Sequence, residues 1–157
     1  MEGKDLSIAL REMARVQPNK LCDKWYESWK DDTDIDTLLN KYIRGFDFCQ
    51  DNDYPPLEFI RNHFNKSDLH RHNIYVDEEV RIEEATSGHY VFLGKCRAYI
   101  SFSGFTAATI YCRHDSEVNV HTSGIPVVFV TYYDRSMGEC VSDGIRKIRR
   151  YDKTKTI

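Results

Sequence analysis

The stretch that decides the fold, residues 101–145, reads SFSGFTAATIYCRHDSEVNVHTSGIPVVFVTYYDRSMGECVSDGI. Glycine returns in it at a constant interval, at Gly104, Gly124 and Gly144. The apolar positions keep the same step, as in Ile100, Val120 and Cys140, or Ala108, Val128 and Ile148. An ungapped period of this size, which extends over residues 86–151, is typical of stacked supersecondary units that bury their apolar faces against one another.

Two architectures are compatible with this repeat. In a parallel β-solenoid, coils of about 20 residues stack directly and equivalent residues form ladders. In an antiparallel meander or barrel, the Ser-Gly and Asp-Gly pairs would be two-residue hairpin turns. Stacking requires identical spacing and a meander does not, so we expect the solenoid and keep the antiparallel sheet as the alternative. Gly104, Gly124 and Gly144 are then structural turns, for which we expect positive φ angles.

The alternation of apolar and polar residues that is typical of strands begins at Ile74. Val80 and Ile82 precede Ile100 and Phe102 by one full period, which predicts an imperfect first repeat. We therefore expect the β half to begin near residue 74.

Three small residues, Cys96, Ser116 and Ser136, share another column of the repeat, which predicts a corner of the coil. Ile148 continues an inward apolar column. This predicts a last strand over residues 146–151, paired with the preceding coil and with its basic side chains outside.

The first half of the chain has helical periodicity. Leu6, Leu10 and Met13 lie on one face of a first helix, and further helices are predicted over 21–29, 38–46 and 57–64. The polar stretch that follows has no periodicity. We therefore expect an α+β protein organised as follows: helical region 1–66, junction 67–73, repetitive β-domain 74–152 and basic tail 153–157.

Composition restricts the classes of protein that fit. Apolar residues make up 41% of the 157 residues and charged residues 30%, with a net charge of −3. This predicts a folded chain and disfavours a surface built throughout for nucleic acid. The five cysteines include no C-x-x-C pair, and no stretch reaches the roughly 18 apolar residues of a membrane span. We expect a cytoplasmic protein with reduced thiols and no membrane association.

Motifs for nucleotide, zinc or hydrolytic chemistry are absent from the sequence. We therefore expect no catalytic residue, no cofactor and no metal. His70 and His72 form an H-x-H pair beside Asp68, but a metal site needs a third or fourth ligand that the spacing does not supply. His114 and Asp115 fall in a predicted loop, where a solvated turn is the expected interpretation.

Two groups of residues are candidates for contact with a partner or ligand. The aromatic group of the second predicted helix is Trp25, Tyr26 and Trp29, which packing within the protein also explains. The basic group is Arg146, Lys147, Arg149 and Arg150. Residues 146–155 carry a net charge of +5, which leaves −8 on the rest of the chain. We expect these charges first to protect a strand edge, with contact to an acidic partner or RNA as the alternative.

Three segments carry a resemblance to a known family: LCDKWYESW (21–29), YIRGFDFCQDNDYPPLEFIRNHF (42–64) and TAATIYCRHD (106–115). They resemble a family of small uncharacterised proteins of gut bacteria and their mobile elements. The resemblance implies a helical first half, a repetitive β second half and an accessory role in the cytosol. It supplies no activity and no catalytic residue.

The expected function is a non-enzymatic one, either protein–protein interaction or a structural accessory role, with another protein as partner. One alternative is an enzyme or small-ligand binder. Its pocket would lie between the halves, lined by Trp25, Tyr26, His70, His72 and Tyr90. The other is a nucleic-acid-associated accessory protein that uses the basic C-terminus.

Overall fold

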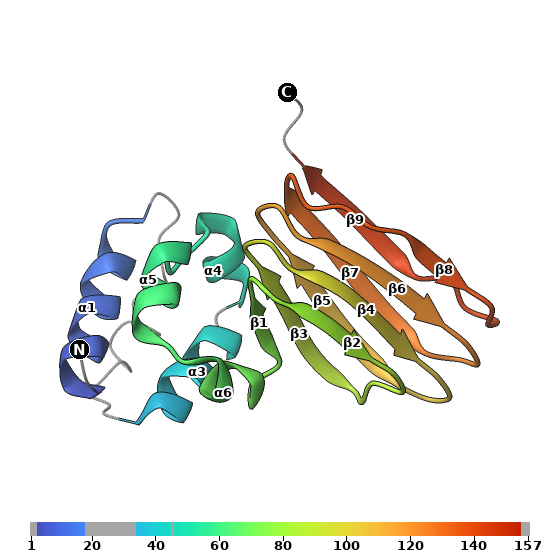
Figure 1. Cartoon of the computed structure of the whole chain (residues 1–157), viewed down its shortest axis with the longest axis horizontal. Coiled ribbons are helices and arrows are strands. Elements are labelled where there is room, and N and C mark those ends of the chain that lie inside the picture. Colours follow the sequence, from blue (N-terminus) through green and yellow to red (C-terminus); the bar gives the residue numbers. More distant parts are fainter. Residues whose placement is uncertain (1–2, 18–33, 45, 155–157) are drawn as a thin grey trace. The chain divides into compact units, whose positions relative to one another are not determined.

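The computed structural model describes residues 3–17, 34–44 and 46–154. The chain divides into two compact units, Met1–His72 and Asn73–Ile157. The first is helical and the second is a parallel β-solenoid of about four turns, so the expected α+β class and the expected solenoid are confirmed (Figure 1). Among the described helices, none is long and apolar enough to cross a membrane.

The helical unit is built on a small apolar core. Its described helices are α1 (Gly3–Arg15), α3 (Ile35–Arg44), α4 (Phe46–Asn52), α5 (Leu57–His63) and α6 (Lys66–His70). Leu6 and Leu10 of α1 pack with Leu38 of α3, and the Tyr54 hydroxyl donates a hydrogen bond of 2.6 Å to the Leu10 carbonyl. The helix predicted over 21–29 lies outside the described residues.

Helix α6 occupies much of the segment that the sequence predicts as a junction. Its N-cap is Asn65, whose side chain accepts a hydrogen bond of 2.8 Å from the Asp68 N–H. Asparagine is among the best N-cap residues, because its short side chain satisfies a backbone donor that the helix leaves free. A five-residue helix is too short for periodicity to reveal it, so the cap was the available signal.

The solenoid consists of two parallel sheets that the chain visits alternately (Figure 1). The five-stranded sheet contains β1 (Ile74–Val76), β3 (Gly88–Leu93), β5 (Ala107–Cys112), β7 (Val127–Asp134) and β9 (Arg149–Thr154). The four-stranded sheet contains β2 (Glu79–Ile82), β4 (Arg97–Phe102), β6 (Glu117–Thr122) and β8 (Cys140–Ser142). Every strand pair is parallel, so the antiparallel alternative is wrong.

The register keeps the period of the sequence from β3 onward, as in Gly88 opposite Ala108. The first coil is shorter. Val80 lies opposite Ala98 and Ile82 opposite Ile100, a smaller separation than the full period, so the register predicted for these two residues is wrong. The physical reason is that ladders fix only the strands, whereas a corner can lose residues without disturbing the pairing on either side of it.

The space between the two sheets is filled by ladders of inward side chains. These include Tyr90, Ile110 and Val130; Phe92, Cys112 and Tyr132; Ile100 and Val120; Ala98 and Val118. All of them are buried. Because equivalent residues stack at the strand spacing of about 4.8 Å, each coil covers the apolar side chains of the next.

The first corner of each coil, between the five-stranded and the four-stranded sheet, begins with a left-handed residue. The equivalent residues are Asp77, Gly94, His114 and Asp134, with φ between 53° and 70°. Where this residue has a polar side chain, that side chain bonds to the backbone of the neighbouring coil. His114 Nδ1 accepts from the Gly94 N–H at 3.0 Å, and Asp134 Oδ2 accepts from the His114 N–H at 3.1 Å.

The predicted column Cys96, Ser116 and Ser136 lies buried at this first corner. The Ser116 hydroxyl accepts from the Cys96 N–H at 3.3 Å and donates to the Gly94 carbonyl at 3.1 Å. The Ser136 hydroxyl is likewise 2.9 Å from the Cys112 carbonyl. Small polar side chains here satisfy backbone groups where the chain bends out of the ladder, as buried polar groups require.

The second corner, between the four-stranded and the five-stranded sheet, contains the glycine column. Gly104 and Gly124 have φ of 64° and 79°, as expected, whereas Gly144 is not among the residues with positive φ. Glycine is required at Gly144 for a different reason. A Cβ there would lie 2.3 Å from the Gly124 carbonyl oxygen, so close stacking of the coils excludes a side chain.

Candidate functional site

The last coil places charged side chains at the end of the apolar core. Arg150 and Asp152 occupy positions of β9 that continue the inward ladders of Val130 and Tyr132. The Arg150 guanidinium lies 4.5 Å from the centre of the Tyr132 ring, donates to the Gly138 carbonyl at 2.7 Å and pairs with Asp152 at 3.0 Å. Arg150 therefore covers the end of the core, and the expectation that all basic side chains of this strand lie outside is wrong for it. The strand also begins later than predicted, at Arg149.

Three other basic residues of this coil are exposed and surround a hollow. Arg146, Lys147 and Arg149 line a depression of about 480 Å³, together with Pro126, Val127, Val128 and Ile148. Among the residues that the structure describes, none forms an ion pair with these three cations. Three uncompensated positive charges at one corner make an attractive field for an anionic group.

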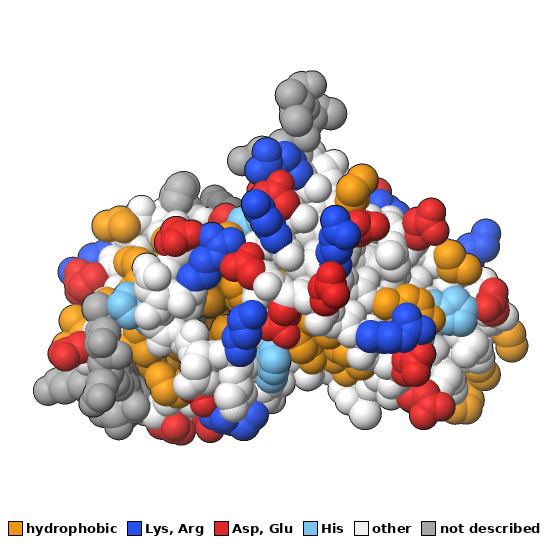
Figure 2. Space-filling view, viewed as in Figure 1, with side chains coloured by type: hydrophobic (Ala, Val, Ile, Leu, Met, Phe, Trp, Pro, Cys, Tyr) orange, Lys and Arg blue, Asp and Glu red, His pale blue; other side chains and the backbone are white. Residues whose placement is uncertain are grey.

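Strand β9 also leaves one edge open. It pairs with β7 on one side, and the described part of the chain adds no strand on the other. Every residue of β9 is exposed. Its outward side chains are Arg149, Tyr151 and Lys153, since they lie opposite Phe129, Thr131 and Tyr133. Figure 2 shows basic side chains over β9, with acidic side chains beside them.

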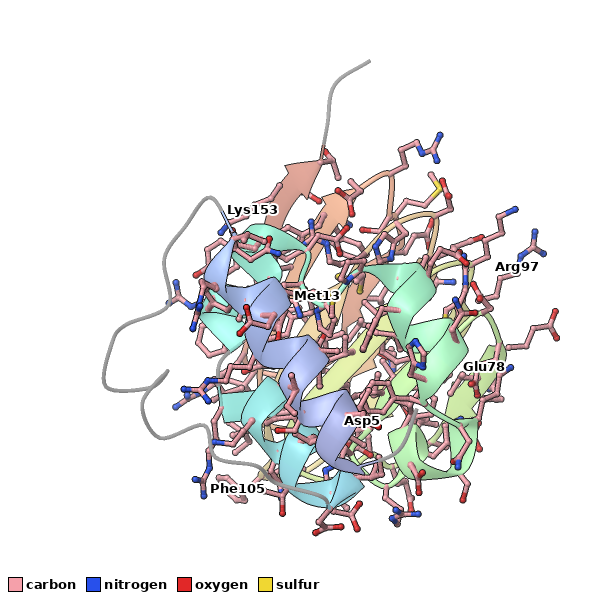
Figure 3. All side chains as sticks on the ribbon, turned by 90° about the vertical axis from the view of Figure 1, so that its left-hand side faces the viewer. Asp5, Met13, Glu78, Arg97, Phe105 and Lys153 are labelled. Atoms are coloured by element: carbon pink, nitrogen blue, oxygen red, sulfur yellow. The ribbon has the colours of Figure 1, made fainter. Side chains whose placement is uncertain are left out.

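A hollow on the outer face of the four-stranded sheet provides a contrast. It measures about 440 Å³ and is lined by Glu79, Val80, Arg81, Arg97, Ala98, Tyr99, Glu117 and Asn119. The ladder places Arg97 between Glu79 and Glu117, and Arg81 pairs with Glu83 at 2.9 Å. Neighbouring opposite charges on one face of a sheet stabilise it and leave little net field. Arg97, labelled in Figure 3, belongs to this compensated face.

The second corner presents apolar side chains to solvent. Phe105 is 86% exposed and Ile145 is 84% exposed, and Ile125 lies between them in the same column. Figure 3 labels Phe105 at the margin of the molecule. Small groups of exposed apolar residues are ordinary on protein surfaces, so this column alone does not define a site.

The two histidines of the H-x-H pair have separate surroundings. The His72 side chain is only 12% exposed, and its Nε2 lies 2.8 Å from Asp36 Oδ1. Arg71 also donates to Asp36 Oδ1 at 3.0 Å and pairs with Asp68. The hydrogen bonds from His72 and Arg71 lower the pKa of Asp36. His70 is exposed at the end of α6. His72 thus fastens the end of the helical unit to α3.

The other residues singled out in the sequence have structural surroundings too. Tyr90 points into the solenoid core, where its hydroxyl donates to the Thr86 carbonyl at 2.7 Å. Asp115 pairs with Arg135 at 2.8 Å. Trp25, Tyr26 and Trp29 lie outside the described residues.

The described cysteines, Cys49, Cys96, Cys112 and Cys140, form no disulfide. Burial raises the pKa of the thiols of Cys49, Cys96 and Cys112. A raised pKa and burial both suppress thiolate chemistry, so these three cysteines act as small core residues. Cys22 is outside the described residues.

The four basic residues that the sequence predicts as one group lie on two faces of the last coil, and two further residues share the outward face. The structure separates Arg150, which covers the core, from Arg149, and it adds Tyr151 and Lys153 on the same outward face. The signal was available in the repeat. Positions 129, 131 and 133 alternate with the inward apolar column, and one period further along the chain they become 149, 151 and 153.

No family model, no curated protein and no solved structure matches this chain. The resemblance to gut-bacterial proteins therefore stays a prediction, and the residues and their geometry carry the functional argument.

Proposed function

We propose that the protein is a non-enzymatic interaction module whose last coil binds an acidic segment of another protein. The observation that carries the proposal is the group of three exposed cations, Arg146, Lys147 and Arg149, around one hollow, none of which pairs with an acidic group of the described residues. The compensated outer face of the four-stranded sheet has no comparable excess of charge.

Edge protection and partner binding do not conflict at this coil. Arg150 covers the core, so the other cations are not needed for that task. Positive charge along an open edge opposes pairing with a second positive edge and favours an acidic one. The same residues can therefore deter self-association and select the partner.

A protein partner suits this coil better than RNA does. Strand β9 offers both donors and acceptors of its backbone along the open edge, which a peptide can match and a phosphate backbone cannot. The rest of the chain carries a charge of −8, which would repel a long nucleic acid beyond the last coil. We place this function in the cytosol, because a reducing compartment suits the unpaired described cysteines.

The test is a selection of random twelve-residue peptides displayed on phage, at about 50 mM salt, where screening of exposed charges is modest. We expect the wild type to enrich peptides rich in Asp and Glu, and the variant Lys147→Glu/Arg149→Glu to lose this enrichment. The matched control is Lys66→Glu/Lys95→Glu, which changes the net charge equally at exposed lysines elsewhere.

Thermal melting of all three proteins shows whether each remains folded. Tighter binding of a labelled single-stranded RNA than of any selected peptide would overturn the proposal, as would equal enrichment by the two double variants.

A further inference from the structure

The outward side chains of β9 form a pattern of their own. Arg149 and Lys153 flank Tyr151, which is 47% exposed, and all three point to the same side of the strand. Between them, the inward residues Arg150 and Asp152 pair with each other. An added strand would therefore meet two cations and one aromatic ring on its outward side, and a neutralised ion pair on its inward side.

We infer that the partner binds as an extended strand added to the open edge of β9, with the pattern acidic–x–aromatic–x–acidic on its outward positions. This inference rests on the proposed function and specifies how the acidic segment is bound. Residues directly opposite each other in neighbouring strands interact, and opposite charges or aromatic pairs at such positions stabilise the sheet. Because the pattern is symmetric, it fits a parallel or an antiparallel added strand.

A second copy of this chain is a poorer occupant of the same edge. If two β9 strands met antiparallel and were centred on Tyr151, Arg149 of each would lie opposite Lys153 of the other. Both pairs would place like charges on the outward face, which destabilises a sheet. On the inward face Arg150 would lie opposite Asp152 of the other copy, but these two residues already pair within each strand and gain little from it. The charges of the edge thus argue for a different, acidic chain.

Backbone hydrogen bonds would supply most of the binding, and the side chains would supply the selection. The hollow around Arg146, Lys147 and Arg149 lies beside the first residue of β9. If the added strand carries further acidic residues at its end nearest Arg149, these residues would reach this hollow.

The probe is a fluorescently labelled nine-residue peptide with the central sequence Glu-Thr-Tyr-Thr-Glu, measured by fluorescence anisotropy. Its counterpart replaces both Glu residues by Lys. We expect the acidic peptide to bind the wild type at least about tenfold more tightly than the basic one. For Arg149→Glu/Lys153→Glu we expect the reverse preference, and for the control Lys66→Glu/Lys95→Glu no change in preference.

Two further peptides have the sequence of the acidic peptide and carry N-methyl groups on every second backbone nitrogen. One peptide is methylated on the odd-numbered nitrogens and the other on the even-numbered ones. An added strand directs one set of N–H groups at β9 and the other set at solvent, so we expect one methylated peptide to lose binding and the other to keep it. If both bind as tightly as the parent, strand addition is overturned, although an acidic partner for the last coil remains.

If the acidic peptide does not bind, the proposal of an added strand is overturned. The phage selection then tests the proposed function independently. A dimer seen by analytical ultracentrifugation and strengthened by Lys153→Glu, which would turn both Arg149–Lys153 pairs into opposite-charge pairs, would assign the edge to a second copy and contradict the inference.

Discussion

The two corners of the solenoid coil reverse the chain by different physical means. At the first corner, side chains form hydrogen bonds with the backbone. His114 and Asp134 bond to the backbone of the neighbouring coil, and the buried Ser116 hydroxyl bridges two backbone groups. At the second corner, glycine permits a left-handed turn and close stacking, and large side chains such as Phe105 face solvent. The first corner accepts different residues at one position, because hydrogen bonds compensate for a strained φ. The second accepts only glycine where the coils touch.

The largest effect is expected where the backbone itself is constrained. Gly124 combines a φ of 79° with a Cβ position only 2.9 Å from the Gly104 nitrogen. Gly124→Val should therefore lower the free energy of unfolding by about 3 kcal/mol or more, since a left-handed β-branched residue and a backbone clash are both costly. Chemical denaturation measures this.

Gly104→Val is the matched control, because Gly104 has a similar φ of 64° but open space around its Cβ position. It should lose only the conformational part, about 1–2 kcal/mol. Equal losses in the two variants would show that coil stacking does not constrain the second corner.

This contrast also explains what the sequence could predict. Close stacking excludes a side chain at Gly124 and Gly144, and the period is visible in Gly104, Gly124 and Gly144, so the solenoid follows from it. The same corner of the first coil has Glu84 with a φ of 54° instead and is not visible in the glycine column. The first corner places aspartate, glycine and histidine at one left-handed position, from Asp77 to Asp134, so periodicity cannot reveal it. The hydrogen bonds there depend on which backbone groups the neighbouring coil presents.

The surface of the last coil was predictable only in part, for a related reason. Its positive charge is visible in the sequence, but inward and outward residues differ by one position. Arg149 and Arg150 are the same type of residue, but they lie on opposite faces of β9. Only the strand register places Arg149 on the outward face and Arg150 on the side of the core.

The second prediction concerns the first corner. Ser116→Ala removes a fully buried hydroxyl that satisfies the Cys96 N–H and contacts the Gly94 carbonyl. The variant should lose about 1–3 kcal/mol in the free energy of unfolding, because the backbone donor is left buried without a partner. Ser103→Ala, at an exposed position of the second corner, should stay within about 0.5 kcal/mol of the wild type. A reversed order of the two losses would mean that side chains hold the second corner instead.

The third prediction concerns the pH dependence of stability at the first corner. Burial of the Asp134 carboxylate raises its pKa, but hydrogen bonds from the Arg113 side chain and the His114 N–H outweigh burial and hold the pKa below the ordinary 3.8. A carboxylate with a depressed pKa stabilises the folded state fully above the unfolded value of about 3.8, and this contribution is lost as the pH falls through the folded value.

Asp134→Asn should therefore differ most from the wild type in unfolding free energy at pH 6 and least near pH 2. The pKa of Asp36 is lowered too, chiefly by its hydrogen bond from His72, but both proteins keep Asp36 and its contribution cancels in the difference. A difference in unfolding free energy that stays constant between pH 6 and pH 2 would show that the ionised Asp134 carboxylate does not stabilise the first corner.

The smallest effect is expected from the exposed apolar side chains of the second corner. Phe105 and Ile145 follow Gly104 and Gly144 directly, and both are largely exposed to solvent. If this corner depends on its backbone alone, Phe105→Ser and Ile145→Ser should each change the free energy of unfolding by less than about 0.5 kcal/mol. Chemical denaturation of the single variants and of the double variant measures this. A loss above about 1 kcal/mol in either single variant would show that the apolar column stabilises the corner, and that glycine is not the whole explanation of its geometry.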